Sequence, residues 1–122
     1  MNGISPQLQN QIAQFQQVQQ QLQAVSTQKA QYDAQRREMM RTLEELKAAT
    51  GDVYKSAGSL LVKVEDKAAL VADLEESVET MEVRVNSLGR QETSLQEKYK
   101  TLSESINAAM GNTRPAAPSD EE

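Results

Sequence analysis

Apolar residues recur at helical spacing in two long blocks of the chain. Heptad a and d positions of the first block are Leu8, Gln11, Phe15, Val18, Leu22, Val25, Lys29, Tyr32, Arg36, Met39, Leu43 and Leu46. Those of the second are Val71, Leu74, Val78, Met81, Val85, Leu88, Glu92, Leu95, Tyr99, Leu102, Ile106 and Ala109. We call these positions the seam. Nine of twelve are apolar in the first block and eleven of twelve in the second, which predicts two coiled-coil helices.

Start and stop signals divide the chain into four segments. Ser5-Pro6 is a favourable helix start, Asp66 or Glu65 can cap a second helix, and Gly111 can end it. We expect an N-terminal helix in 1–50, a β-hairpin in 51–65, a C-terminal helix in 66–110 and a disordered acidic tail in 111–122.

Helices of equal length with a short connector favour an antiparallel pair, because the two seams can then meet within one chain. This alignment places Phe15 near Leu102 and Leu22 near Leu95. Both termini then lie at one end of the pair, and the hairpin lies at the other.

The stretch between the helices, "VYKSAGSLLVKV" at 53–64, is typical of a short strand pair with its turn at Ala57-Gly58. A two-stranded hairpin is marginal alone, and its edges carry unpaired backbone groups. A flexible loop is the alternative interpretation. We favour closure of hairpins from several subunits into a β-barrel, which removes the edges. The predicted assembly residues are Val53, Tyr54, Leu60, Leu61, Val62 and Val64.

The first 28 residues contain no charged side chain and are rich in glutamine. Such a helix could bind apolar segments of many sequences, because it has no charge that would repel them. Alternatively, the glutamines could be ordinary coiled-coil residues of good helix propensity without a binding role. Apolar residues at this end of the predicted pair form a candidate capture site, which we call the terminal cluster: Leu8, Ile12, Phe15, Ile106 and Met110.

Composition excludes several functions. The chain has no Cys, His or Trp, so zinc sites of the Cys/His type, thiol chemistry and Ser-His relays are excluded. The net charge of −5 without a basic stripe argues against nucleic acid as a partner. No apolar run is long enough for a membrane span and no signal peptide is evident, so we expect a soluble protein in the cytoplasm. Paired carboxylates such as Glu44-Glu45 are typical of solvated helix faces, and no catalytic residue or metal ligand is predicted.

Three stretches carry a resemblance to the β subunit of prefoldin, in particular its archaeal form: "IAQFQQVQQQLQAVSTQK" at 12–29, "VYKSAGSLLVKV" at 53–64, and "ADLEESVETMEVRVNSLGRQETSLQEKYKTL" at 72–102. The resemblance implies a hexamer of two α and four β subunits, in which hairpins form a barrel body and coiled coils project from it. It also implies an ATP-independent holdase that captures non-native polypeptides at coiled-coil tips and delivers them to a group II chaperonin. No cofactor is implied. A structural or tethering coiled coil without substrate capture is the alternative.

Overall fold

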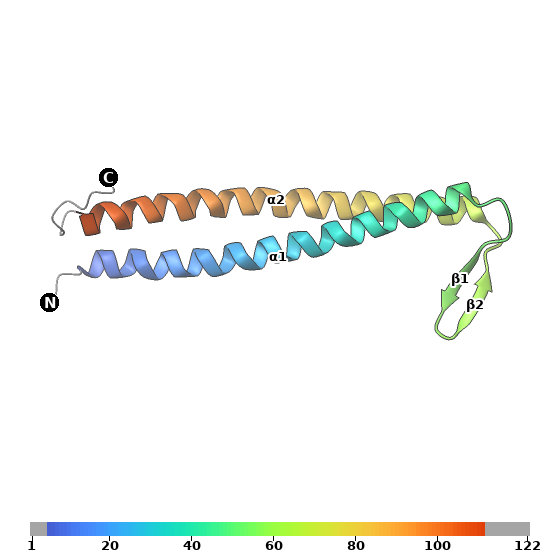
Figure 1. Ribbon diagram of the computed structural model, residues 1–122, viewed down its shortest axis with the longest axis horizontal. Helices are drawn as coiled ribbons and strands as arrows, with labels where there is room; N and C mark the ends of the chain where they lie inside the picture. Colours follow the sequence, from blue (N-terminus) through green and yellow to red (C-terminus); the bar gives the residue numbers. More distant parts are fainter. Residues whose placement is uncertain (1–4, 112–122) are drawn as a thin grey trace. The chain divides into compact units, whose positions relative to one another are not determined.

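The computed structural model describes residues 5–111, which form two long helices and one hairpin (Figure 1). Helix α1 spans Pro6–Ala48, and helix α2 spans Lys67–Gly111. Between them in the chain, strands β1 (Tyr54–Ala57) and β2 (Leu60–Lys63) pair antiparallel. The predicted fold class is therefore confirmed for the single chain, while the intersubunit barrel stays a prediction. The tail from residue 112 lies outside the described residues.

Side-chain caps fix the start of both helices. The hydroxyl of Ser5, the residue directly before Pro6, accepts a hydrogen bond from the backbone N–H of Leu8 at 3.1 Å. In the same way, Asp66 Oδ1 accepts from the backbone N–H of Ala69 at 3.0 Å. Each bond satisfies an amide that the first helical turn leaves without a partner. Asp66 is thus the residue that caps α2.

The chain divides into two compact units, and the first consists of residues up to Thr27 together with those from Gly89 onward. Here α1 and α2 run antiparallel. The rings of Phe15 and Tyr99 lie 4.7 Å apart between centroids, and Ser26 Oγ donates to Glu92 Oε2 at 2.5 Å. The predicted neighbour of Phe15 is Leu102, and Tyr99 lies only three residues before Leu102 in α2. The contact between Phe15 and Tyr99 therefore supports the predicted alignment.

The second unit comprises residues 28–88, and its helices are also antiparallel. Arg84 stacks over the ring of Tyr32, with its guanidinium carbon 5.5 Å from the ring centroid. Nearer the hairpin, Lys47 Nζ lies 3.0 Å from Glu75 Oε2. Lys67 Nζ donates to the carbonyl of Ala49 at 2.5 Å, joining the beginning of α2 to the end of α1. The hairpin belongs to this unit.

Burial follows the predicted seam. Every seam position is buried or half-buried, whereas most other helical positions are exposed. The buried apolar side chains are Leu8, Val18, Leu46, Val78 and Leu88. Each helix can bury only the stripe that faces its partner, so a helix pair has a narrow core.

The hairpin is tightly paired, but its turn lies one residue later than predicted. Ala57 pairs with Leu60 in the ladder, so the two turn residues are Gly58 and Ser59. Gly58 has a φ of 63°, in the left-handed region that glycine adopts without steric cost. Beyond the strands, Val64 N donates to the carbonyl of Val53 at 2.8 Å, which extends the pairing toward the helices.

Candidate assembly and capture surfaces

The hairpin register sorts its side chains onto two faces, because directly paired residues share a face and neighbours along a strand alternate. One face carries Tyr54, Ser56, Leu61 and Lys63, and the other carries Lys55, Ala57, Leu60 and Val62. Each face therefore holds at least one large apolar side chain. This arrangement differs from that of an ordinary surface hairpin, in which one face is polar.

Four of the six predicted assembly residues are exposed large apolar residues of the hairpin. Leu60 is 67% exposed and Leu61 is 74% exposed, on opposite faces, and Tyr54 and Val62 are exposed as well. Val53 and Val64, where the hairpin joins the helices, are half-buried. Complete burial of a leucine side chain stabilises by about 1.5–3 kcal/mol. The hairpin therefore carries unused apolar surface on both faces.

The terminal cluster lies in the first unit, with different degrees of exposure. Leu8 is buried, at 7% exposed, whereas Met110 is 38% exposed. Ile12, Phe15 and Ile106 are half-buried, and Phe15 is engaged with Tyr99. Met110 is thus the most accessible of the five, and Leu8 can meet a ligand only where the helix ends separate.

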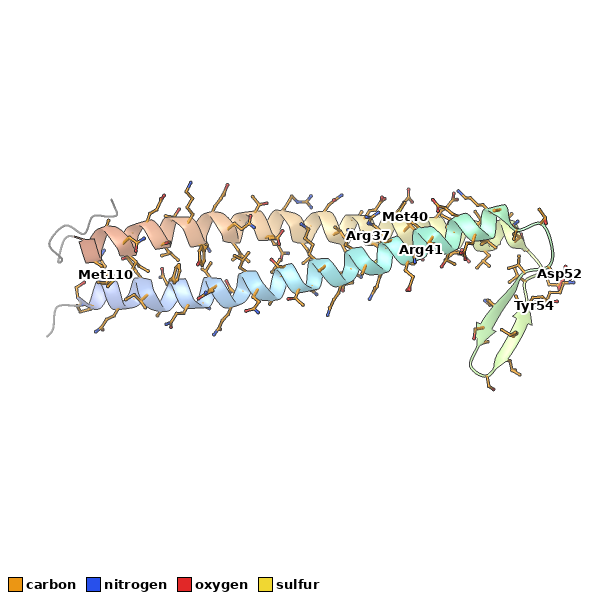
Figure 2. All side chains as sticks on the ribbon, viewed as in Figure 1. Arg37, Met40, Arg41, Asp52, Tyr54 and Met110 are labelled. Carbon is orange, nitrogen blue, oxygen red and sulfur yellow. The ribbon has the colours of Figure 1, made fainter. Side chains whose placement is uncertain are left out.

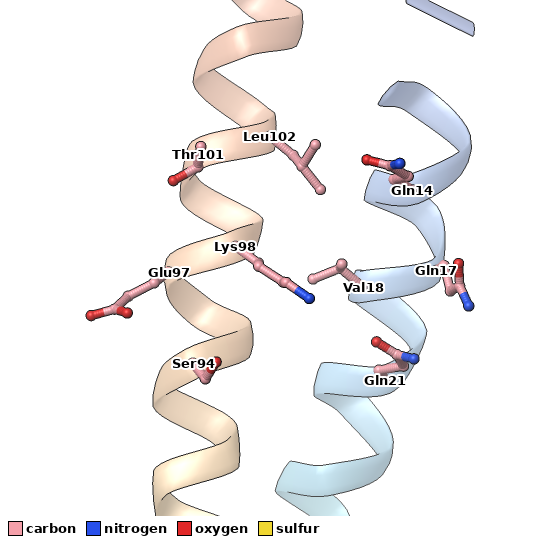
Figure 3. Close-up of a pocket in the computed structure, with 9 residues that line it drawn as sticks. All are labelled: Gln14, Gln17, Val18, Gln21, Ser94, Glu97, Lys98, Thr101 and Leu102. Carbon is pink, nitrogen blue, oxygen red and sulfur yellow. The ribbon is translucent and has the colours of Figure 1, made fainter. Parts of the chain in front are cut away.

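A groove of about 640 Å³ opens between α1 and α2 in the first unit (Figure 3). We call it the glutamine groove. Val18 and Leu102 point between the helices and form its floor, beside the side chain of Lys98 (Figure 3). Its other lining residues are Gln14, Gln17, Gln21, Ser94, Glu97 and Thr101.

Sequence reasoning did not find this groove, because its polar residues lie beside the seam, at positions that are usually classed as solvent-facing. A signal was present nonetheless. Gln14 and Gln21 are seven residues apart, and so are Ser94 and Thr101. Residues at heptad spacing lie on one side of a coiled-coil helix, so each pair can form one wall.

A charge cluster lies on α1 in the second unit. Asp33 Oδ1 accepts from Arg36 Nη2 at 2.9 Å, and Asp33 Oδ2 lies 2.7 Å from Arg37 Nη2. The hydrogen bond from Arg36 is the main reason that the pKa of Asp33 lies below its ordinary value, and the nearby charge of Arg37 adds to the effect. Arg36 also donates to Met40 Sδ at 3.0 Å, and Figure 2 labels Arg37 and Met40 on this part of the helix. These contacts within one helix favour the helical state.

Residues 5–111 contain neither a candidate metal-binding cluster nor a candidate membrane-spanning helix. No group of three or more His, Cys, Asp or Glu side chains is placed to hold a metal ion in this part of the chain. No helix within the same residues is long and apolar enough to cross a membrane.

Comparison with known proteins links this architecture to one family. A family model described as "Prefoldin subunit" matches residues 9–113. Prefoldin subunit beta of Archaeoglobus fulgidus is 51% identical over 65 residues, which cover 52% of this chain and 56% of the relative. Prefoldin subunit beta of Methanosarcina acetivorans is 48% identical over 62 residues, covering 49% and 53%. The chain thus spans about half the length of the curated relatives it matches.

A solved structure extends the likeness to nearly the whole chain. The crystal structure of the prefoldin beta subunit from Thermococcus strain KS-1 matches with a TM-score of 0.81 and 41% identity. This match covers 94% of the present chain and 99% of the other. The resemblance predicted from the three sequence stretches is confirmed.

Proposed function

Because this chain belongs to the prefoldin subunit family, we propose that it is a subunit of an ATP-independent holdase chaperone. It captures non-native polypeptides at the ends of its coiled coil and delivers them to a group II chaperonin. The proposed assembly is a cytoplasmic hexamer of two α subunits and four β subunits, in which this chain is a β subunit. In this proposal capture rests on weak apolar contacts at several coiled-coil ends, and no nucleotide, metal or catalytic residue takes part.

The observation that carries the assembly part of the proposal is the incomplete hairpin. Its strands have two open edges, and Leu60 and Leu61 expose apolar surface on opposite faces. Unpaired strand edges attract other strands, and closure with neighbouring hairpins would satisfy both edges and cover apolar side chains. A hairpin of this kind is built to be completed by other subunits. A coiled coil that only tethers two partners needs no such element.

We assign capture to the terminal cluster. Met110 is exposed, and Ile12 and Ile106 are half-buried close to the helix ends. Helix ends open more readily than helix centres, and methionine adapts its shape to varied partners. One such end binds weakly. Several ends in one assembly bind the same unfolded chain together, and the raised effective concentration supplies the affinity.

Aggregation of a chemically denatured enzyme after dilution tests the proposal. The chain, co-assembled with an α partner, should suppress light scattering at near-stoichiometric amounts and without ATP. An Ile12→Ser/Met110→Ser variant should lose most of this suppression. Val83→Ser is the matched control, because Val83 is 65% exposed and lies on α2 outside the terminal cluster.

Two outcomes would contradict the proposal in different ways. Wild-type protein that assembles but does not suppress aggregation would favour the tethering alternative. Full suppression of aggregation by the Ile12→Ser/Met110→Ser assembly would show that the terminal cluster is not the capture site. Delivery is tested by adding a group II chaperonin to the complex with captured enzyme, and we expect recovery of enzyme activity only when both chaperones are present.

A further inference from the structure

The glutamine groove combines an apolar floor with polar walls, and the one charged group that extends into the space between the helices is the ammonium of Lys98 (Figure 3). Gln14 and Gln21 line the α1 side, and Ser94 and Thr101 line the α2 side. In Figure 3, Gln17 and Glu97 extend outward from the two helices, away from the space between them. The groove volume of about 640 Å³ lies in the range of roughly 300–1,000 Å³ that is usual for ligand sites.

We infer that the glutamine groove binds an extended polypeptide segment through its main-chain amides. The inference rests on the proposed holdase function and adds a second contact site, distinct from the terminal cluster. A glutamine amide offers both a donor and an acceptor, and a hydroxyl does the same. A peptide bond needs this same combination, since each residue carries one N–H and one C=O.

The spacing of the wall residues fits an extended chain. Seven helical residues rise by about 10.5 Å, which separates Gln14 from Gln21 and Ser94 from Thr101. An extended chain covers this distance in about three residues. Within residues 5–111, no intramolecular hydrogen bond engages these four side chains. They are exposed and available to a segment lying along the groove.

The chemistry of the groove favours the main chain over particular side chains as the recognised feature. The α1 wall is uncharged, so neither acidic nor basic segments are repelled there. Val18 and Leu102 offer a shallow apolar floor without a deep pocket for one side chain. Lys98 can donate from its ammonium group to a carbonyl oxygen. A site that reads peptide bonds accepts many sequences, which is what a holdase requires.

Two synthetic peptides test the inference directly. Both have the same sequence of alternating leucine and serine and a fluorescent label, but one is N-methylated at every second peptide bond. Methylation removes backbone donors and leaves the side chains unchanged. Fluorescence anisotropy with the assembled wild-type protein should show binding of the methylated peptide weakened by about tenfold, as expected for the loss of one or two hydrogen bonds.

A pair of matched variants locates the effect. Gln14→Ala/Gln21→Ala should weaken binding of the unmethylated peptide by about fivefold to tenfold and should reduce the difference between the peptides. Gln16→Ala/Gln23→Ala is the control, because it makes the same change at the same spacing on exposed positions of α1 outside the groove. Its binding should match wild type. Alanine is a good helix former, so both variants should keep their helicity, which circular dichroism checks.

The outcomes separate the groove from the proposed function. The groove inference would be overturned if wild-type protein bound both peptides equally. It would also be overturned if the groove variant and the control variant bound the unmethylated peptide equally. If aggregation suppression persisted in that case, the holdase proposal would stand without the groove. If the assembled wild-type protein neither bound a peptide nor suppressed aggregation, the holdase proposal and the groove inference would both fail.

Discussion

The helices and the hairpin use similar apolar residues in opposite ways. Along α1 and α2, every seam residue is at least half-buried against the partner helix. On the hairpin, Leu60, Leu61 and Val62 are consecutive and all exposed. The helices bury their stripe within one chain, whereas the hairpin cannot cover either face by itself. Leu46 and Leu60 are chemically identical, but one is 7% and the other 67% exposed.

This difference separates two kinds of stability. Seam residues stabilise the single chain, because the two helices of that chain already bury them against each other. Hairpin residues are expected to stabilise only the assembly, because their apolar surface leaves water when other subunits bind. Substitutions in the two regions should therefore change different measured quantities.

The largest expected effect comes from charge on the hairpin. Leu60→Lys/Leu61→Lys places one ammonium group on each face, and burial of an unpaired charge is strongly unfavourable. We expect loss of the assembly, measured as a fall in mass by light scattering after mixing with an α partner, with helicity retained. Val83→Lys, at an exposed position of α2, should leave the mass unchanged. Intact assembly of the double variant would contradict the assigned role of the hairpin.

The same substitution at two sites tests the comparison more finely. Leu46→Ala should lower the free energy of unfolding by about 2–3 kcal/mol, because it removes buried methyl groups from the seam. Leu60→Ala should leave the unfolding of the isolated chain nearly unchanged and weaken assembly. Urea denaturation followed by circular dichroism measures the first quantity, and concentration-dependent mass measures the second. If Leu46→Ala and Leu60→Ala gave similar results in either assay, the separation between chain stability and assembly stability would be wrong.

Much of the helical architecture could be predicted from the sequence, because seam burial follows directly from the heptad period. Ser5-Pro6 marked the start of α1 correctly for the same local reason that makes serine a good cap. The turn was predicted one residue early. The residues Ala57, Gly58 and Ser59 allow more than one two-residue loop, and the pairing of Ala57 with Leu60 selects between them.

The candidate sites were less accessible to sequence reasoning than the fold. Leu8 belongs both to the seam and to the terminal cluster, and only the packed structure shows that it is buried. The glutamine groove requires two helices in a definite alignment, so no property of Gln14 or Ser94 alone could indicate it. Assembly through the hairpin depends on surfaces of other chains. It stays a prediction that the exposed leucines motivate.

A moderate effect is expected at the hairpin turn. No atom outside Gly58 and its chain neighbours lies within 4 Å of the position that a Cβ on Gly58 would occupy, and Gly58 has a φ of 63°. Gly58→Ala therefore adds no clash but forces alanine into the left-handed region, at about 1 kcal/mol. The cost applies to the paired hairpin, and we expect assembly to weaken by about fivefold. Gly51→Ala is the control, because Gly51 also has open space around it but no positive φ. Sedimentation at several concentrations measures both variants. Equal assembly of the Gly58→Ala and Gly51→Ala variants would mean that the turn conformation does not limit hairpin pairing.

The smallest effect is expected on the polar side of α1, where Asp33 contacts Arg36 and Arg37. Asp33→Asn removes both ion pairs, one of them to the seam residue Arg36, and replaces no residue of the seam or the hairpin. The thermal midpoint at pH 7 should fall slightly, and the assembled mass should not change. Glu38→Gln is the control, because it makes the same carboxylate-to-amide change at an exposed position on the same helix. It should have a smaller effect on the midpoint than Asp33→Asn.

The pH dependence of the Asp33→Asn effect follows from the lowered pKa of the Asp33 carboxyl group, whose ordinary value is 3.8. Above that value the carboxylate is charged in both the folded and the unfolded chain, so its stabilising effect is fully present. As the pH falls through the lower folded-state pKa, the carboxylate is protonated and the effect is lost. Thermal melts of wild type and variant should therefore converge in strong acid. A difference that grew on acidification would show that Asp33 does not stabilise α1 through its charge.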